Sequence, residues 1–112
     1  MRLVNLTPHA LHIATNGETV VLPPSGNIAR VETERETSMF VEFEGIEIPV
    51  STTKLGTPVG LPEAEPDTLL IVSGMVAGHP EMKNRFDVVS PGPPLRDEEG
   101  RVIGCDGLTY PR

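Results

Sequence analysis

The sequence has few aromatic residues and no tryptophan. Phe, Trp and Tyr together make up 4% of its 112 residues. Aromatic rings supply much of the apolar area that ordinary cores bury. The sequence therefore predicts a core of Val, Ile, Leu and Met, with Phe40, Phe43 and Phe86 as its few large side chains.

Cysteine, basic residues and long apolar runs are scarce as well. A single cysteine, Cys105, excludes an intramolecular disulfide and favours a reducing compartment. Nine Lys and Arg stand against 16 Asp and Glu, for a net charge of −7. Proteins that bind a nucleic-acid backbone or an anionic membrane need clustered cations, so neither partner is expected. Since no apolar run approaches the length of a membrane span, the sequence predicts a soluble, cytoplasmic protein.

Glycine and proline, in contrast, are abundant, with 11 and 12 copies. They separate short runs of alternating or β-branched residues, a pattern typical of strands joined by tight turns. Asn16-Gly17 between two such runs predicts a β-hairpin over residues 10–22, because both turn positions favour positive φ. Further strands are expected over residues 2–6, 28–34, 39–44, 46–50, 68–72 and 86–89, and a last hairpin over 95–105.

Two features refine this fold. Met39, Val41 and Phe43 share one face of their predicted strand while Glu42 and Glu44 face water, a half-buried pattern. Residues 51–68 lack periodicity and are expected to form a long loop, either a surface excursion or a lid.

The whole chain, residues 1–112, is expected to form one domain, because single domains most often have about 100–150 residues. The predicted fold is mainly β, or a β-rich α+β arrangement. It is a small antiparallel β-sandwich or barrel of about seven to eight short strands. One short helix near 73–79 is expected, with Ser73 as its cap and Pro80 ending it.

Four segments carry a resemblance. NLTPHALHI at 5–13, LPPSG at 22–26, LLIVSGMVAGHP at 69–80 and RFDVVSPGPPLRDEEGRVIGC at 85–105 resemble a group of short uncharacterised proteins from actinobacteria and their phages. Residues 30–68 are covered least. The resemblance implies a small cytoplasmic or phage-borne protein and no mechanism, since no activity is established for the group.

The histidines and the cysteine do not form a recognisable metal or catalytic motif. His9 and His12 would point to opposite sides of a strand, and no zinc-type spacing is present. We therefore expect no metal and no cofactor, and Cys105 is expected to be a structural thiol. A small hydrolase that uses His9, Asp87 or Cys105 is the third functional hypothesis.

The leading hypothesis concerns the basic residues of segment 83–101, which include Arg85 and Arg96. Arginine suits bidentate recognition of carboxylate or phosphate, and the amides after Ser73 suit an anion. The sequence thus favours a non-enzymatic protein that binds a small anionic, nucleotide-like ligand and, in a phage setting, sequesters a host signal. The predicted site consists of Ser73, Gly74, Arg85, Asp87 and Arg96.

Two other interpretations stay open. The first is a structural corner, in which the arginines pair with Asp87 or with the Glu98-Glu99 turn. The second is an interaction or structural module that docks on a protein partner through an edge strand and the 51–68 loop. A homo-oligomer or a protein partner is expected, because short strands with few aromatics leave edges to cover.

Overall fold

The computed structural model describes residues 1–111 and is mainly β, as predicted, with 54% of the chain in strands. Among the described residues, no helix is long and apolar enough to cross a membrane. The elements are β1 (Arg2–Asn5), β2 (Leu11–Thr15), β3 (Glu18–Leu22), β4 (Arg30–Phe43), β5 (Ile46–Val59), β6 (Thr68–Ile71), α1 (Gly74–Ala77), the 3-10 helix η1 (Pro80–Asn84), β7 (Val88–Pro91), β8 (Pro94–Arg96), β9 (Val102–Asp106) and β10 (Leu108–Thr109).

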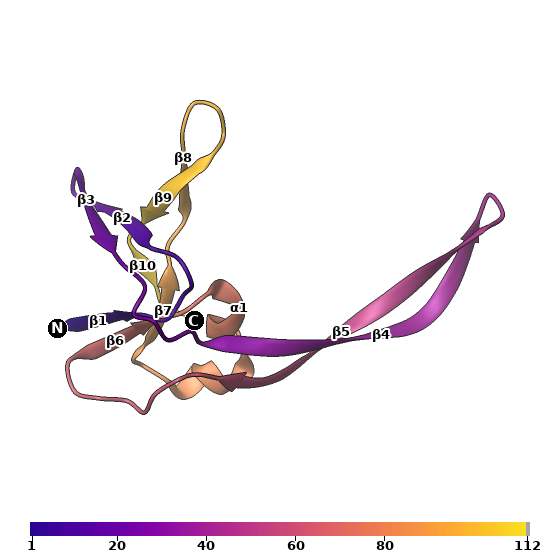
Figure 1. Cartoon of the computed structure of the whole chain (residues 1–112), viewed down its shortest axis with the longest axis horizontal. Helices are drawn as coiled ribbons and strands as arrows, with labels where there is room; N and C mark the ends of the chain where they lie inside the picture. The colour runs from indigo at the N-terminus through magenta and orange to yellow at the C-terminus, as the bar shows by residue number, and fades with distance from the viewer. Residues whose placement is uncertain (112) are drawn as a thin grey trace.

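The strands form three sheets rather than the expected antiparallel sandwich or barrel (Figure 1). One has the order β1-β6-β7-β10, another β3-β2-β9-β8, and the third is the β4–β5 ribbon. The pairs β1/β6, β6/β7 and β2/β9 are parallel, and no barrel closes. Alternation in a sequence marks strands but does not select their partners, so the parallel pairing was not predicted. The structure also has more strands than the seven to eight expected.

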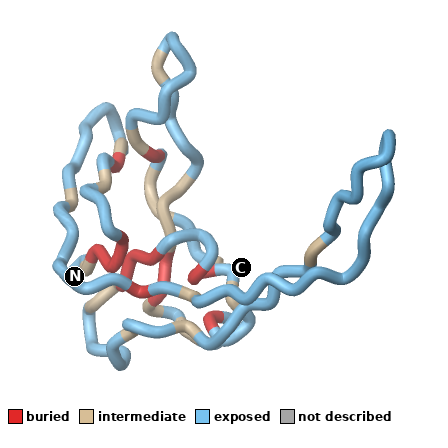
Figure 2. Tube along the Cα trace, turned by 45° about the vertical axis from the view of Figure 1, so that its right-hand side comes forward, coloured by how far each residue is buried: buried red, intermediate tan, exposed pale blue. Residues whose placement is uncertain are grey.

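The core lies around β6, whose run of apolar residues suits a strand covered on both faces. Leu70, Ile71 and Val72 are buried; β6 lies between β1 and β7, and helix α1 packs on β7 and β4. Figure 2 shows most of the buried residues gathered there, with separate ones such as Ile13 and Cys105 in the second sheet. The main cluster contains Leu6, Ala29, Leu70, Val72, Val76, Ala77, Met82 and Val88.

The three phenylalanines do not belong to this core, which corrects the prediction. Phe40, Phe43 and Phe86 are 61%, 63% and 68% exposed. Aliphatic side chains and Met82 fill the small interior instead, and Phe40 and Phe43 lie in a part of the chain that extends away from it.

The local turn chemistry was predicted well. Asn16 and Gly17 have φ of 49° and 80° and close the β2–β3 hairpin, as the Asn-Gly pair requires. The β8–β9 hairpin forms as expected. The predicted helix at 73–79 is shorter, at Gly74–Ala77, and is capped by Ser73, whose side chain accepts a hydrogen bond from the Val76 amide.

The predicted loop at 51–68 is wrong for its first half. Residues 51–59 continue β5, which pairs with β4 along 14 residues in each strand. Register shifts at Val31/Thr33 and Thr37/Met39 adjust the pairing, so the segment lacks the regular alternation that would have marked it as strand. We call β4–β5 the arm and the rest of the described chain the body.

The arm gives the molecule an extended shape. It projects from the body in Figure 1 and is exposed along nearly its whole length in Figure 2. The Cα radius of gyration is 17.7 Å, whereas a compact domain of this length has about 13 Å. Most of the arm therefore lies beyond the reach of the core.

The corner after β7 passes the chain from one sheet to another. β7 pairs with β10, and β8 pairs with β9. Between them the Gly92 amide donates to the Gly107 carbonyl at 2.9 Å, and the Asp106 amide donates to the Pro93 carbonyl at 2.9 Å. A Cβ at Gly92 would overlap the Asp106 carbonyl oxygen, so the corner requires glycine there.

We expect Gly92→Ala to lower the free energy of unfolding by at least about 2 kcal/mol, because the backbone at the crossing has to move apart. Gly74→Ala is the matched control. An added Cβ meets nothing within 4 Å at Gly74, and alanine in a helix should leave stability unchanged or raise it by up to about 1 kcal/mol. Urea denaturation measures both. Equal stability of the two variants would contradict the close approach.

Candidate functional site

Arg85 and Asp87 form a two-bond ion pair just before β7. Arg85 Nε donates to Asp87 Oδ1 and Nη2 donates to Oδ2, both at 2.8 Å. Nη2 also donates to the Pro62 carbonyl at 3.1 Å. The side chains are 27% and 13% exposed. The pairing of Arg85 with Asp87 is what the structural-corner interpretation predicts. The added bond to Pro62 joins the start of β7 to the segment that follows the arm.

The ion pair also sets the charge state of Asp87. Hydrogen bonds from Arg85, and then its positive charge, hold the Asp87 pKa below its ordinary value, against the opposing effect of burial. The same interaction raises the Arg85 pKa. Both groups therefore keep their charges at neutral pH and largely neutralise each other.

Arg96 lies far along the β8–β9 hairpin, where its Nη1 donates to the Gly100 carbonyl at 2.8 Å. In the adjoining turn Arg101 pairs with Asp97 at 3.1 Å and with Glu99 at 2.8 Å. Hydrogen bonds from the Arg101 amide first of all, and also from the Glu99 amide, lower the Asp97 pKa. The basic residues of this hairpin are thus engaged within their own turn.

The five residues of the predicted ligand site do not gather at one place. β6 and β7 run parallel, with Leu70 opposite Val88 and Ile71 opposite Val89. Ser73 and Gly74 follow the carboxyl end of β6, whereas Arg85 and Asp87 precede the amino end of β7. Arg96 belongs to β8, in the sheet with the order β3-β2-β9-β8. Arg85 and Asp87 are in contact with each other, and the ligand-binding role of all five stays a prediction.

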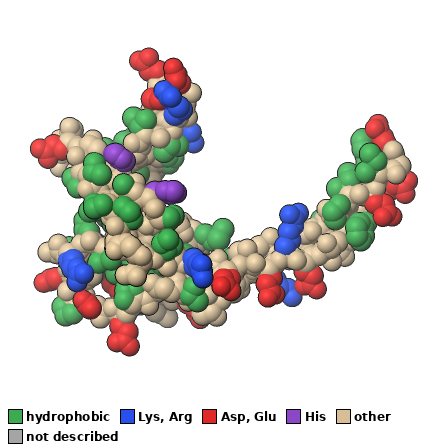
Figure 3. All heavy atoms as spheres, in the orientation of Figure 1, with side chains coloured by type: hydrophobic (Ala, Val, Ile, Leu, Met, Phe, Trp, Pro, Cys, Tyr) green, Lys and Arg blue, Asp and Glu red, His purple; other side chains and the backbone are tan. Residues whose placement is uncertain are grey.

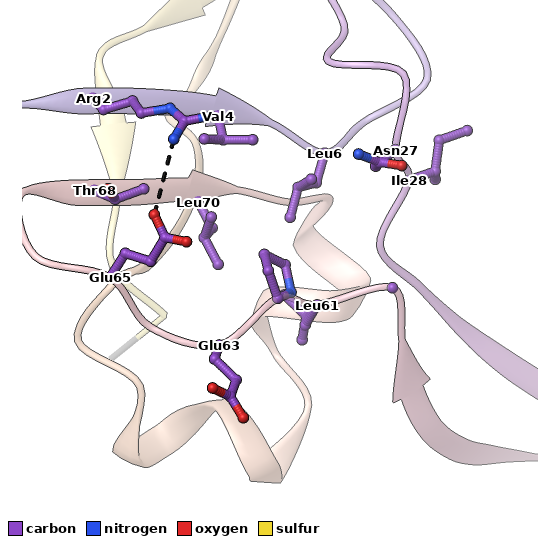
Figure 4. A pocket seen from close by; sticks show the side chains of 12 residues that line it. Arg2, Val4, Leu6, Asn27, Ile28, Leu61, Glu63, Glu65, Thr68 and Leu70 are labelled. Atoms are coloured by element: carbon purple, nitrogen blue, oxygen red, sulfur yellow. Dashed lines mark ion pairs between the residues drawn. The ribbon is translucent and has the colours of Figure 1, made fainter.

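Two hollows lie on the body. One of about 420 Å³ is lined by Arg85 and Asp87 together with Met1, Ala64, Asp67, Thr68, Leu69, Asn84, Phe86 and Tyr110. The other, of about 470 Å³, has apolar walls that include Val4, Leu61 and Leu70, with the Arg2–Glu65 ion pair at one edge and Glu63 farther along it (Figure 4). Ser73, Gly74 and Arg96 line neither hollow. In both, acidic side chains outnumber the single arginine.

The opening motif NLTPH forms a polar cluster within the fold. Asn5 is buried, and its amide group donates to the His9 carbonyl at 2.9 Å and to the Leu22 carbonyl at 3.1 Å. Its oxygen accepts from the Thr7 amide at 2.9 Å. These contacts fix the start of the chain against β3. The Thr7 hydroxyl also donates to the His9 carbonyl at 3.1 Å, so side chains of the motif itself cap the turn around Pro8.

His9 and His12 are exposed, and the Cys105 thiol is buried and donates to the Gly107 carbonyl at 3.5 Å. Among residues 1–111, no three His, Cys, Asp or Glu side chains are grouped to hold a metal ion. His79 has a structural contact of its own: Nδ1 accepts from the Glu81 amide and Nε2 lies 2.9 Å from the Gly56 carbonyl of the arm.

The chain was compared with protein-family models, curated proteins and solved structures. Nothing matches in any of the three comparisons. The function therefore has to be argued from the geometry of this chain.

The outer half of the arm carries an extended exposed apolar surface. Cross-strand partners share a face, and the register pairs Met39 with Val50, Val41 with Ile48 and Phe43 with Ile46. We call these six residues the apolar face. Their exposure runs from 42% at Val50 to 65% at Ile46. Figure 3 shows hydrophobic side chains over this part of the arm, with acidic side chains beside them.

The opposite face of the outer arm is different. It pairs Phe40 with Pro49 and Glu42 with Glu47. The alternation of Met39, Val41 and Phe43 with glutamates had predicted a strand buried on one face. The pattern is present, but no part of the described chain covers that face. Sequence reasoning foresaw the alternation but not that the described chain would leave this face exposed.

Arg85→Ala should lower the free energy of unfolding by about 1.5–3 kcal/mol, because it leaves a shielded carboxylate without its charged hydrogen-bond donor. Arg96→Ala is the matched control and should change it by less than about 1 kcal/mol, as for an exposed contact within one turn. Chemical denaturation of both variants measures the difference. A similar cost for the two changes would contradict a special role of the Arg85–Asp87 pair.

The lowered Asp87 pKa makes this contribution depend on pH. A carboxyl whose pKa is depressed in the folded state stabilises that state fully above its unfolded pKa, close to 3.8, and loses the effect as pH falls through the folded value. The difference in unfolding free energy between wild type and Asp87→Asn should therefore be constant between about pH 5 and pH 7 and shrink below about pH 3.8. A difference that grows in acid would refute it. Asp97, whose pKa is also lowered, is present in both proteins, so its contribution cancels in the difference.

Proposed function

We propose that the protein is a non-enzymatic interaction module that acts as a homo-oligomer, assembled through the apolar face of its arm. One observation carries the proposal: six apolar side chains on one side of a two-stranded ribbon have no cover within the described chain. The proposal corresponds to the docking module considered from the sequence, with the arm in place of the expected loop.

Physical reasoning supports a covered arm. A two-stranded hairpin is at best marginally stable alone in water, and needs a third strand or a packed face. Six side chains that are each about half exposed present on the order of 500 Å² of apolar surface, at about 150 Å² or more for a large side chain. The largest apolar patch on a typical monomer covers about 300–600 Å² and is often functional, so a patch of this size supports an interaction site.

A second copy of the chain suits this surface. Two apolar faces packed together would remove about 1,000 Å² of apolar area, and the flanking atoms bring the total to the lower range of specific interfaces, about 1,200 Å². The face carries no charge, and Glu42 and Glu47 lie on the other side of the ribbon. A chain with a net charge of −7 can therefore meet its own copy there without facing carboxylates.

A second candidate is the binding of a small ligand in the 420 Å³ hollow, which brings Arg85 together with Asn84, Phe86 and Tyr110. Guanidinium, amide and aromatic groups are the kinds of side chain that hold a ring-bearing polar molecule. The anionic character expected from the sequence is less favoured, because Asp67 and Asp87 line the same hollow. Sequestration of a host signal in a phage or cytoplasmic setting stays a prediction of the resemblance.

The double variant Val41→Thr/Ile48→Thr should raise the dissociation constant of the oligomer at least tenfold. It places hydroxyl groups at the centre of the apolar face and keeps the β-branched shape that strands favour. The matched control, Glu42→Thr/Glu47→Thr, changes the pair directly beside it on the opposite face and should leave association as strong as in wild type. Sedimentation velocity over a concentration series measures all three proteins.

A wild-type protein that sediments as a monomer at 12.1 kDa throughout the series would overturn the proposed function. Equal weakening by both double variants would show that association, where present, does not use the apolar face.

The ligand candidate predicts thermal stabilisation by the right compound. A ligand at 100 times its dissociation constant adds about 2.7 kcal/mol of stability, which raises Tm by roughly 10 °C in a domain of this size. A screen of nucleosides, nucleotides and inorganic phosphate tests this. The gain should be lost in Tyr110→Ala and kept in Arg96→Ala. No shift with any compound would remove this candidate.

A further inference from the structure

We infer that the arms of two copies stack face to face and antiparallel, with a twofold axis at the Val41–Ile48 pair. The inference rests on the proposed function and names its geometry. The tip of each arm then points toward the body of the other copy, and the apolar faces form a small two-layer core.

Face-to-face stacking is favoured over pairing at the strand edges. Both strands of the arm have a free outer edge, because β4 and β5 pair only with each other. Edge pairing would extend the ribbon but leave the apolar faces of both copies in water. Pro49 also lies in the outer half of β5 and lacks an amide donor, which interrupts strand addition on that side. Stacking covers all six residues of each face.

The boundaries of the face suit a twofold axis. Toward the body the face stops at the register shift between Thr37 and Met39, and at the tip it stops at the turn of Glu44 and Gly45. The Val41–Ile48 pair is the middle of the three apolar pairs. A rotation about it sets Phe43 and Ile46 of one copy over Met39 and Val50 of the other, so each layer finds an apolar partner.

The net charge and the size of the two bodies favour the antiparallel direction. Parallel stacking would place two bodies side by side, in a protein with a net charge of −7 per chain. Antiparallel stacking overlaps only the outer arms, because the polar inner half, which includes the Glu36–Lys54 pair, lies between each apolar face and its own body. The two bodies then lie at opposite ends of the dimer, well beyond a Debye length of about 8–10 Å.

Cross-linking between single cysteines tests this arrangement. The variants carry Cys105→Ala, because the native thiol must not react, and one added cysteine each: Val41→Cys, Met39→Cys, Phe43→Cys or, on the opposite face, Glu42→Cys. Packed sheets lie about 10 Å apart, so a short bismaleimide spans the gap whereas a disulfide needs Cα atoms within about 7 Å. The covalent dimer is measured on a denaturing gel, and the same samples are sedimented before reaction.

Val41→Cys should cross-link to itself, since it lies next to its own copy at the axis. A mixture of Met39→Cys and Phe43→Cys should cross-link at least tenfold faster than either alone, and Glu42→Cys should give no dimer above background. Rapid self-linking of Phe43→Cys with no gain in the mixture would overturn the inference in favour of parallel arms. A sedimenting oligomer without any of these cross-links would also overturn it, in favour of an arm packed on a partner's body. Wild-type protein that sediments as a monomer beside these samples would overturn the proposed function itself.

Discussion

The pairing of β6 with β1 and β7 is the interaction on which the rest of the fold depends. These strands come from distant parts of the sequence and meet through bonds such as Leu6 amide to Ile71 carbonyl at 2.8 Å and Val72 amide to Val89 carbonyl at 2.9 Å. Leu70, Ile71 and Val72 are buried between their neighbours. α1 and η1 then close the core, with Val76, Ala77 and Met82 as their buried residues.

This small core explains why the body leaves the outer arm uncovered. The main cluster uses residues of the body, and of the arm only Val31, near its base, packs against it. His79 ties the base of the arm through its contact with the Gly56 carbonyl. Beyond that base, the ribbon relies on cross-strand pairs alone. An apolar face left in water gains no hydrophobic stabilisation, whereas burial contributes roughly 25 cal/mol per Å². Association with a second copy would supply this hydrophobic stabilisation, and the stability of the fold would then depend on protein concentration.

The sequence predicted features that local chemistry determines. Asn16-Gly17 specified its hairpin, Ser73 its cap, and the Pro- and Gly-rich segment after Ser90 its corner. Features set by long-range pairing escaped it: the parallel strands around β6, the strand at 51–59, and the exposure of Phe40 and Phe43. For the site, the alternation around Val41 marked an apolar face, but a sequence pattern cannot tell whether the rest of the chain covers that face. The ligand-binding role given to Arg85 stays a prediction, and its contact with Asp87 matches the structural alternative that was weighed against a ligand.

Small-angle X-ray scattering of the wild-type protein tests the central claim most directly, because the proposed dimer has an unusual shape. We predict twice the chain mass of 12.1 kDa. We also predict a distance distribution with a second maximum at roughly 70 Å or more, since two inner arms and one overlap, at about 3.3 Å per residue, separate the bodies. A single compact peak at the mass of one chain, with a radius of gyration close to the 17.7 Å of the isolated Cα trace, would contradict it.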